Sequence, residues 1–132
     1  MTVRGWAIGA TLLGVGAAQA AGSPLERYRW SERVLVVSAP GAGDPNLAAQ
    51  RAILAEVRPG LKERDLVTLE AVGDAPEARR LRATLRLPPD AFRVVLIGKD
   101  GEPKRVEGTP LPAAALFETI DAMPMRRDET RR

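Results

Sequence analysis

Runs of apolar residues, separated by polar residues, glycine and proline, divide most of this chain into alternating strands and helices. Three runs are almost continuously apolar and contain β-branched side chains, as strands buried on both faces usually do. They lie at residues 33–39, 66–72 and 93–97. A fourth, short strand is predicted around residues 103–106, because the Asp100-Gly101 pair before it favours a hairpin turn.

The helix after the first strand has a clear start. Asp44 is a favoured N-cap residue, and Pro45 fits the first helical turn, where its missing amide hydrogen is not needed. From there apolar residues, Leu47 among them, recur at helical spacing and form one buried face. Pro59-Gly60 should break or tighten this helix near its end.

Two more helices follow the second strand and the hairpin. Residues 76–85 place apolar side chains inward, and we expect Arg79, Arg80 and Arg82 to form a solvated face. Residues 112–123 close the fold with a second apolar helical face.

The predicted order of elements is therefore β-α-β-α-β-β-α. Buried strands joined by helices imply right-handed crossovers and a central sheet with helices on both faces, and the hairpin adds an antiparallel edge. This is the topology of a thioredoxin-like three-layer α/β/α sandwich, in the α/β class. A chain of 132 residues has room for one such domain, predicted over residues 25–123. Tyr28 and Trp30, ahead of the first strand, are expected to pack against the body of this domain.

Residues 1–20 have the pattern of an export signal and are set aside from the fold. Arg4 supplies a positive start, an apolar run covers residues 6–18, and Ala18-Gln19-Ala20 matches a cleavage site. The run is shorter than the roughly 20 apolar residues that span a bilayer, although a retained membrane anchor is the alternative. The sequence therefore predicts a signal peptide and a periplasmic or secreted protein, with no stable membrane insertion after cleavage.

The chain contains neither cysteine nor histidine, and this absence excludes several kinds of chemistry. Peroxide reduction and disulfide exchange need a thiolate, and serine hydrolases usually need a histidine base. Zinc and iron sites ordinarily rely on the same two residue types, so we expect no metal and no cofactor. The 20 basic and 17 acidic residues are well mixed and aromatic residues are few, so no nucleic-acid partner is expected.

One edge of the predicted sheet is a candidate ligand site. Asp44 at the start of the first helix and Asp74 after the second strand approach the carboxyl edge of the strands, with Arg51 one helical face away. Two carboxylates there could do acid–base work or bind a small ligand. Alternatively, Asp44 caps its helix and Asp74 belongs to a turn.

The C-terminal segment, residues 124–132, is the second candidate surface, and we expect a basic tail with a frayed end. Met125, Arg126 and Arg127 combine a flexible apolar side chain with a basic pair, which suits docking to an acidic partner or an anionic surface. Alternatively, the methionine seals the last helix and the arginines are solvated.

Four short stretches, taken in order, carry a further signal. They are residues 25–30 (LERYRW), 61–66 (LKERDL), 92–101 (FRVVLIGKDG) and 121–129 (DAMPMRRDE). Together they resemble a peroxiredoxin-like family of exported bacterial domains known as domain of unknown function 4174. The resemblance covers nearly the whole chain after the leader and implies a thioredoxin-like fold with no established activity. It also implies related domains in secreted vertebrate proteins that carry sushi repeats.

The broader peroxiredoxin pattern is matched only in part. Pro40 matches, whereas Asp44 occupies the threonine position and Leu47 the position of the peroxidatic cysteine. Arg93 is an imperfect match to the arginine expected near the third strand. We therefore predict a non-catalytic binding module whose partner is an envelope or periplasmic protein. A small-ligand binder or non-thiol enzyme at the Asp44/Asp74 edge is the alternative.

Overall fold

The computed structural model describes residues 23–131, and the signal peptide predicted over residues 1–20 lies outside this part. A short 3₁₀ turn, η2 (Glu26–Tyr28), comes first. The strands are β1 (Arg33–Ala39), β2 (Leu66–Val72), β3 (Arg93–Ile97) and β4 (Pro103–Glu107). The helices are α2 (Pro45–Glu56), α3 (Arg58–Glu63), α4 (Pro76–Leu85), α5 (Ala113–Asp121) and α6 (Pro124–Thr130). Within residues 23–131, no helix is long and apolar enough to cross a membrane.

The four strands form one sheet in the order β2-β1-β3-β4. β1 and β2 are parallel, whereas β3 is antiparallel to β1 and β4 is antiparallel to β3. The sequence predicted crossovers that keep all three buried strands parallel. This prediction is wrong for β3, which is antiparallel to β1. The register gives the reason, because Ala39 pairs with Val72 and Ser38 with Arg93. The last residue of β2 and the first residue of β3 therefore lie at the same end of the strands, beside the end of β1. The α4 connection does not carry the chain back along the sheet, so β3 runs in the opposite direction to β2.

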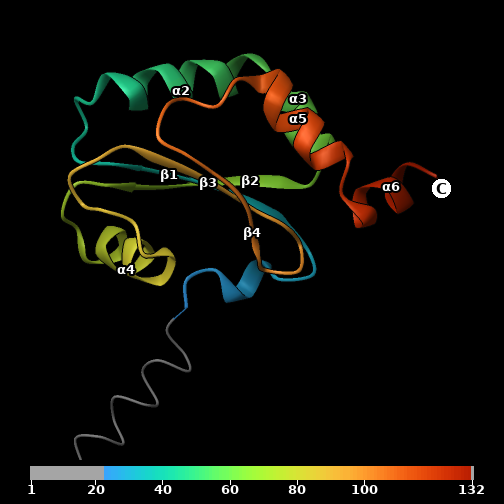
Figure 1. The fold of residues 1–132 in the computed structure, drawn as a ribbon, viewed down its shortest axis with the longest axis horizontal. Helices are drawn as coiled ribbons and strands as arrows, with labels where there is room; N and C mark the ends of the chain where they lie inside the picture. The colour runs from blue at the N-terminus through green and yellow to red at the C-terminus, as the bar shows by residue number, and fades with distance from the viewer. Residues whose placement is uncertain (1–22, 132) are drawn as a thin grey trace, which may run out of the picture.

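Helices cover both faces of the sheet, which confirms the three-layer prediction (Figure 1). On one face, α2, α3 and α5 pack over Leu35 and Leu96 of the two central strands. On the other face, α4 packs over Val36 and Val95, with Tyr28 of η2 at its margin. The apolar runs that predicted buried strands therefore supply both halves of the core, since successive side chains of a strand point to opposite faces.

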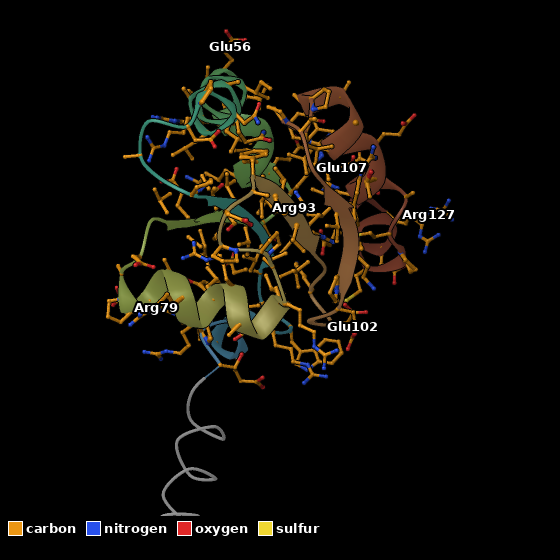
Figure 2. The ribbon with its side chains drawn as sticks, turned by 60° about the vertical axis from the view of Figure 1, so that its left-hand side comes forward. Glu56, Arg79, Arg93, Glu102, Glu107 and Arg127 are labelled. Carbon is orange, nitrogen blue, oxygen red and sulfur yellow. The ribbon has the colours of Figure 1, made fainter. Side chains whose placement is uncertain are left out.

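Arg82 differs from the prediction of a solvated arginine face on α4. Its side chain is buried, and its guanidinium donates hydrogen bonds to the carbonyl oxygens of Ala71 and Gly73 at the end of β2. Arg79 does point outward from α4 (Figure 2). Arg82 lies one turn after the buried Ala78, on the inward side of the helix, where its guanidinium satisfies backbone carbonyls at the end of β2.

Trp30 also differs from its prediction, because 62% of its surface is exposed. Its φ of 71° lies in the left-handed region, which a bulky residue rarely adopts. The Trp30 amide donates a 2.6 Å hydrogen bond to the Lys99 carbonyl, so the backbone is anchored while the indole stays outside. Tyr28 packs as expected.

A buried glutamine joins α2 to the connection between β4 and α5. The side-chain Nε2 of Gln50 donates to the Leu111 carbonyl at 3.1 Å, and its Oε1 accepts from the Leu111 amide at 2.7 Å. Both residues are almost completely buried. The pair satisfies backbone groups in a segment that has no strand or helix of its own.

Candidate functional site

The first candidate edge is the start of α2, where the peroxiredoxin pattern places a cysteine. The Asp44 carboxylate accepts hydrogen bonds from the amides of Asn46 at 2.8 Å and Leu47 at 3.3 Å, so it caps the helix. Leu47 is completely buried in the core. The amides at the start of α2 are therefore already bonded to Asp44 and cannot bind an anion. The buried side chain of Leu47 occupies the position of the peroxidatic cysteine.

Arg51 and Asp74 do not join Asp44 in one site. The Arg51 guanidinium bonds to Glu70 of β2 at 2.6 and 2.8 Å, and this bonding holds the pKa of Glu70 below its usual range. Asp74 is exposed in the turn after β2. In the described part of the chain no hydrogen bond links the three side chains, and no three acidic residues are grouped as metal ligands would be.

A cysteine placed at the peroxidatic position should be inert. In Leu47→Cys we expect a thiol reagent to label the protein only as fast as it unfolds, because burial shields a thiol and raises its pKa. Met125→Cys, at a position that is 39% exposed, is the matched control and should react at the rate of a free thiol. Equally fast labelling of both variants would show that this edge opens in the folded state.

The segment expected to be a basic tail is helix α6. Arg127 extends away from the body, as expected of a solvated arginine (Figure 2). Arg126, in contrast, is only 5% exposed, because its guanidinium bonds to Glu63 at 3.0 Å and to Asp121 at 3.2 Å. The two arginines therefore do not form an exposed basic pair, and of the three predicted docking residues only Met125 and Arg127 are accessible.

Glu129 of α6 is the centre of the contacts that hold this helix to the body. Its carboxylate bonds to the two terminal nitrogens of Arg33 at 3.2 and 3.3 Å and to the Lys99 ammonium at 2.7 Å. Burial alone would raise the pKa of Glu129, but the hydrogen bonds from Lys99 and Arg33 outweigh burial and lower it. Arg33 is completely buried, and it also donates to the Arg64 carbonyl at 2.7 Å.

These contacts belong to a larger group of balanced charges, which we call the terminal ion-pair cluster. Its members are Arg33, Glu63, Arg64, Asp65, Lys99, Asp121, Arg126 and Glu129. Arg64 bonds to Asp121 through two 3.0 Å hydrogen bonds and lies over the Phe117 ring at 4.0 Å. Apart from Met123 at its start, α6 has no residue in the apolar core clusters of the described chain, so charge holds it in place.

Acid should weaken this cluster. A hydrogen bond from Arg64 lowers the pKa of Asp121, and Glu129 is shifted in the same direction. A carboxyl group with a lowered pKa in the folded state adds stability above its unfolded pKa, and loses that stability as the pH falls through the folded pKa. Urea denaturation should therefore show the free energy of unfolding decreasing between about pH 5 and about pH 3. An Asp121→Asn/Glu129→Gln variant with an equally steep decrease would contradict this assignment.

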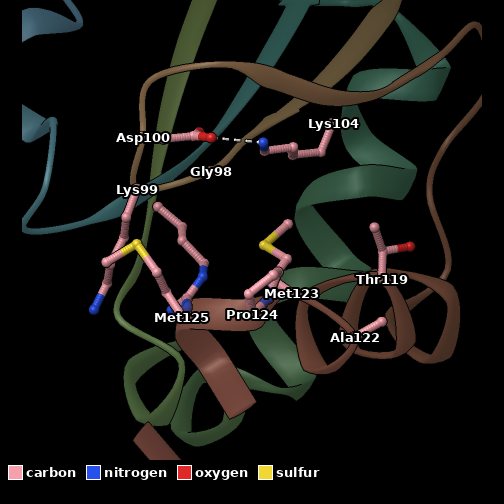
Figure 3. A pocket seen from close by; sticks show the side chains of 10 residues that line it. Gly98, Lys99, Asp100, Lys104, Thr119, Ala122, Met123, Pro124 and Met125 are labelled. Atoms are coloured by element: carbon pink, nitrogen blue, oxygen red, sulfur yellow. Dashed lines mark hydrogen bonds and ion pairs between the residues drawn. The ribbon is translucent and has the colours of Figure 1, made fainter. Parts of the chain in front are cut away.

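Beside the cluster lies a cleft of about 490 Å³, between the β3–β4 hairpin and the corner from α5 to α6 (Figure 3). We call it the hairpin cleft. Met123, Pro124 and Met125 line one side, Lys99 and Lys104 line the hairpin side, and Arg33 contributes to the lining from β1. Most of the lining surface is apolar. The Lys104 ammonium lies 2.8 Å from the Asp100 carboxylate in an exposed ion pair.

The hairpin cleft and the peroxidatic position lie at opposite ends of the sheet. β1 runs from Arg33, which lines the cleft, to Ala39, which precedes α2. A strand of this length spans about 20 Å. Arg93 pairs with Ser38 near the α2 end, and its guanidinium donates to the Phe92 carbonyl at 2.7 Å. A ligand in the cleft would therefore be remote from the edge where peroxiredoxin chemistry takes place.

The four stretches that carry the family resemblance meet at this end of the sheet. Residues 61–66, 92–101 and 121–129 supply every member of the terminal ion-pair cluster except Arg33. The fourth stretch reaches the hairpin through the hydrogen bond from Trp30 to Lys99. The sequence did not indicate this site directly. The available signal was the dense alternation of acidic and basic residues inside those stretches.

The four-stranded sheet with helices on both faces defines a thioredoxin-like domain, and its sequence contains no cysteine. Its structure is similar to that of a reduced 2-Cys peroxiredoxin from Plasmodium vivax, with a TM-score of 0.60 over 80% of this chain and 84% of that one. Identity is 13%, so the likeness concerns the fold. The chain belongs to the family described as Domain of unknown function (DUF4174), whose family model matches residues 24–129.

Several longer proteins contain a similar region. The sushi repeat-containing protein SRPX of Homo sapiens is 30% identical over 119 residues, covering 80% of this chain and 26% of that protein, and the Rattus norvegicus protein gives the same values. Coiled-coil domain-containing protein 80 of Danio rerio is 26% identical over 132 residues, which is 80% of this chain and 15% of that protein. The chain thus spans about a quarter or less of the length of these relatives.

Proposed function

We propose that this chain is a non-catalytic binding module and that the hairpin cleft is its binding site. The observation that carries the proposal is the convergence, on the cleft and the terminal ion-pair cluster, of the four stretches in which the family resemblance was noted. The residues of an active site would be expected to gather where the reaction occurs. Here the position of the thiol is filled by buried Leu47, whereas the terminal ion-pair cluster and the hairpin cleft lie at the other end of the sheet.

The chemistry of the cleft suits a partner that presents an apolar group next to negative charge. Met123 and Met125 are flexible and polarizable, so they can adapt to the shape of an inserted group. Lys104 and Arg127 add exposed positive charge on the hairpin and on α6. This basic and apolar surface replaces the Met125-Arg126-Arg127 strip expected from the sequence, with Lys104 in place of the buried Arg126.

The export signal predicted over residues 1–20 adds a location to the proposal. We propose a periplasmic or secreted protein whose partner is another envelope protein. The presence of similar regions as one part of longer relatives supports a role as a module rather than as a self-contained enzyme. The alternative at the Asp44/Asp74 edge has no comparable support, because Asp44 caps α2 and Arg51 is bonded to Glu70.

A crosslinking pull-down from an extract of the cell envelope tests this proposal. The purified wild-type protein is compared with Met125→Glu, which places a negative charge in the lining of the cleft. We expect the wild type to capture a partner and Met125→Glu to lose it, because the new carboxylate repels an acidic partner and blocks the apolar wall.

Val106→Glu is the matched control. Val106 is an exposed aliphatic residue of β4 that does not line the cleft, so this variant should retain the partner. Equal capture by all three proteins would show that the partner binds elsewhere and would contradict the proposal. Thermal unfolding of each variant checks that the fold is intact.

A further inference from the structure

The lining of the hairpin cleft includes a guanidinium that is only partly satisfied. Arg33 is completely buried, and its two terminal nitrogens bond to Glu129 and to the Arg64 carbonyl. Its Nε, also buried, has no hydrogen-bond partner among residues 23–131. A buried donor without an acceptor destabilises the folded state, and a ligand that brings an acceptor would remove this penalty.

The acceptor that best suits this position is a carboxylate. A hydrogen bond between a guanidinium and a carboxylate is charge-assisted and about twice as strong as one between neutral groups. Lys99 is already bonded to Asp65 and Glu129, so it stabilises the inner side of the cleft. Within the part of the chain that the structure describes, Lys104 is bonded only to Asp100. This ion pair is exposed, and such pairs contribute little to stability and exchange readily.

The rest of the cleft suits an apolar chain. Ala122, Met123, Pro124 and Met125 form a continuous lining without a charged group. The volume of about 490 Å³ lies within the range of small-molecule pockets. Methionine side chains adjust to a flexible hydrocarbon better than branched or aromatic ones do.

We propose that the hairpin cleft binds a carboxylic acid with an unbranched apolar chain, whose carboxylate lies near Arg33 Nε and Lys104 and whose chain lies against Met123 and Met125. This inference rests on the proposed function, because it assigns a ligand class to the same cleft. Such a group can come from a free fatty acid or from the apolar C-terminal residue of a peptide.

Isothermal titration of the full chain with octanoate, octanamide and octanol tests the ligand class. We expect octanoate to bind, and octanamide and octanol to bind about tenfold or more weakly, because they lack the charge that strengthens the hydrogen bond. Equal affinity for the three compounds, or no binding of octanoate, would overturn the proposal.

Two variants locate the ligand. Met125→Glu should abolish octanoate binding through charge repulsion and occlusion, whereas Val106→Glu, outside the cleft, should bind octanoate as the wild type does. Unchanged binding in Met125→Glu would overturn the proposal even if octanoate binds. Arg33 itself is not replaced, because that change would leave Glu129 and the Arg64 carbonyl with fewer partners and alter the fold.

The outcomes separate this inference from the function on which it rests. If octanoate and octanol bound equally and both lost binding in Met125→Glu, the proposed recognition of a carboxylate would be wrong. The cleft would still be a binding site. A protein partner that persists in Met125→Glu would instead contradict the proposed function. A short acetylated peptide ending in methionine, whose side chain is apolar and unbranched, is compared with its C-terminal amide to distinguish the sources. Binding of the free acid form supports a peptide end, and binding of octanoate alone supports a free acid.

Discussion

Replacement of Glu129 by glutamine should lower the free energy of unfolding by about 3 kcal/mol, because it leaves a buried guanidinium without its counter-ion. Arg33 is completely buried, and Glu129 is the carboxylate that bonds to both of its terminal nitrogens. Glutamine keeps the shape of the side chain but cannot neutralise Arg33 or Lys99. Urea denaturation at neutral pH, followed by circular dichroism, measures the change.

The matched control is Glu102→Gln. Glu102 is exposed in the turn between β3 and β4 and points away from the body (Figure 2), so its replacement should change the free energy of unfolding by less than about 0.5 kcal/mol. A similarly small effect for Glu129→Gln would mean that the terminal ion-pair cluster does not hold α6, and our account of the C-terminal segment would then be wrong.

The second large effect is expected at Gln50. In Gln50→Met the volume of the side chain is nearly kept, but the amide and carbonyl of Leu111 lose their partners in the core. Each buried backbone group left without a partner costs about 1–3 kcal/mol, so we expect a total loss of about 3 kcal/mol. Thermal and urea unfolding measure it, and hydrogen exchange at the Leu111 amide should accelerate.

Ala49→Met serves as the control, because it adds the same side chain at the neighbouring, exposed position of α2. It should leave both the unfolding midpoint and the exchange of the Leu111 amide unchanged. If Gln50→Met behaved like this control, the connection between β4 and α5 would be held by its apolar contacts alone, and the hydrogen-bonded pair would have no structural role.

Most of the fold could be predicted because its signals are local. β1, β2, β3 and α4 begin and end where the apolar runs and their proline and glycine boundaries predict, and Asp44 caps α2. α6 could not be predicted in this way. Its residues form no apolar stripe, and the interactions that hold it come from Glu63, Lys99 and Arg33, which are distant in the sequence.

The candidate sites were harder to predict for the same reason. Asp44 and Asp74 were grouped because both follow strands at one edge, but local spacing does not fix where side chains point, and Arg51 turns to Glu70 instead. Arg33 stands at the start of an apolar run, where a charged residue is usually a solvated boundary. Arg33 is instead completely buried and bonded to Glu129 of α6, and this partner cannot be recognised from the residues around Arg33.

The pairing of the first strand with the last helix has a consequence for synthesis of the chain. Arg33 and Glu129 are separated by 96 positions, so every strand and helix between them must be made before the guanidinium can meet its counter-ion. Until then, burial of β1 leaves a charge uncompensated, which opposes early completion of the core. We expect the growing chain to remain loosely packed on the ribosome, and to close its sheet and hairpin cleft together once Glu129 has emerged.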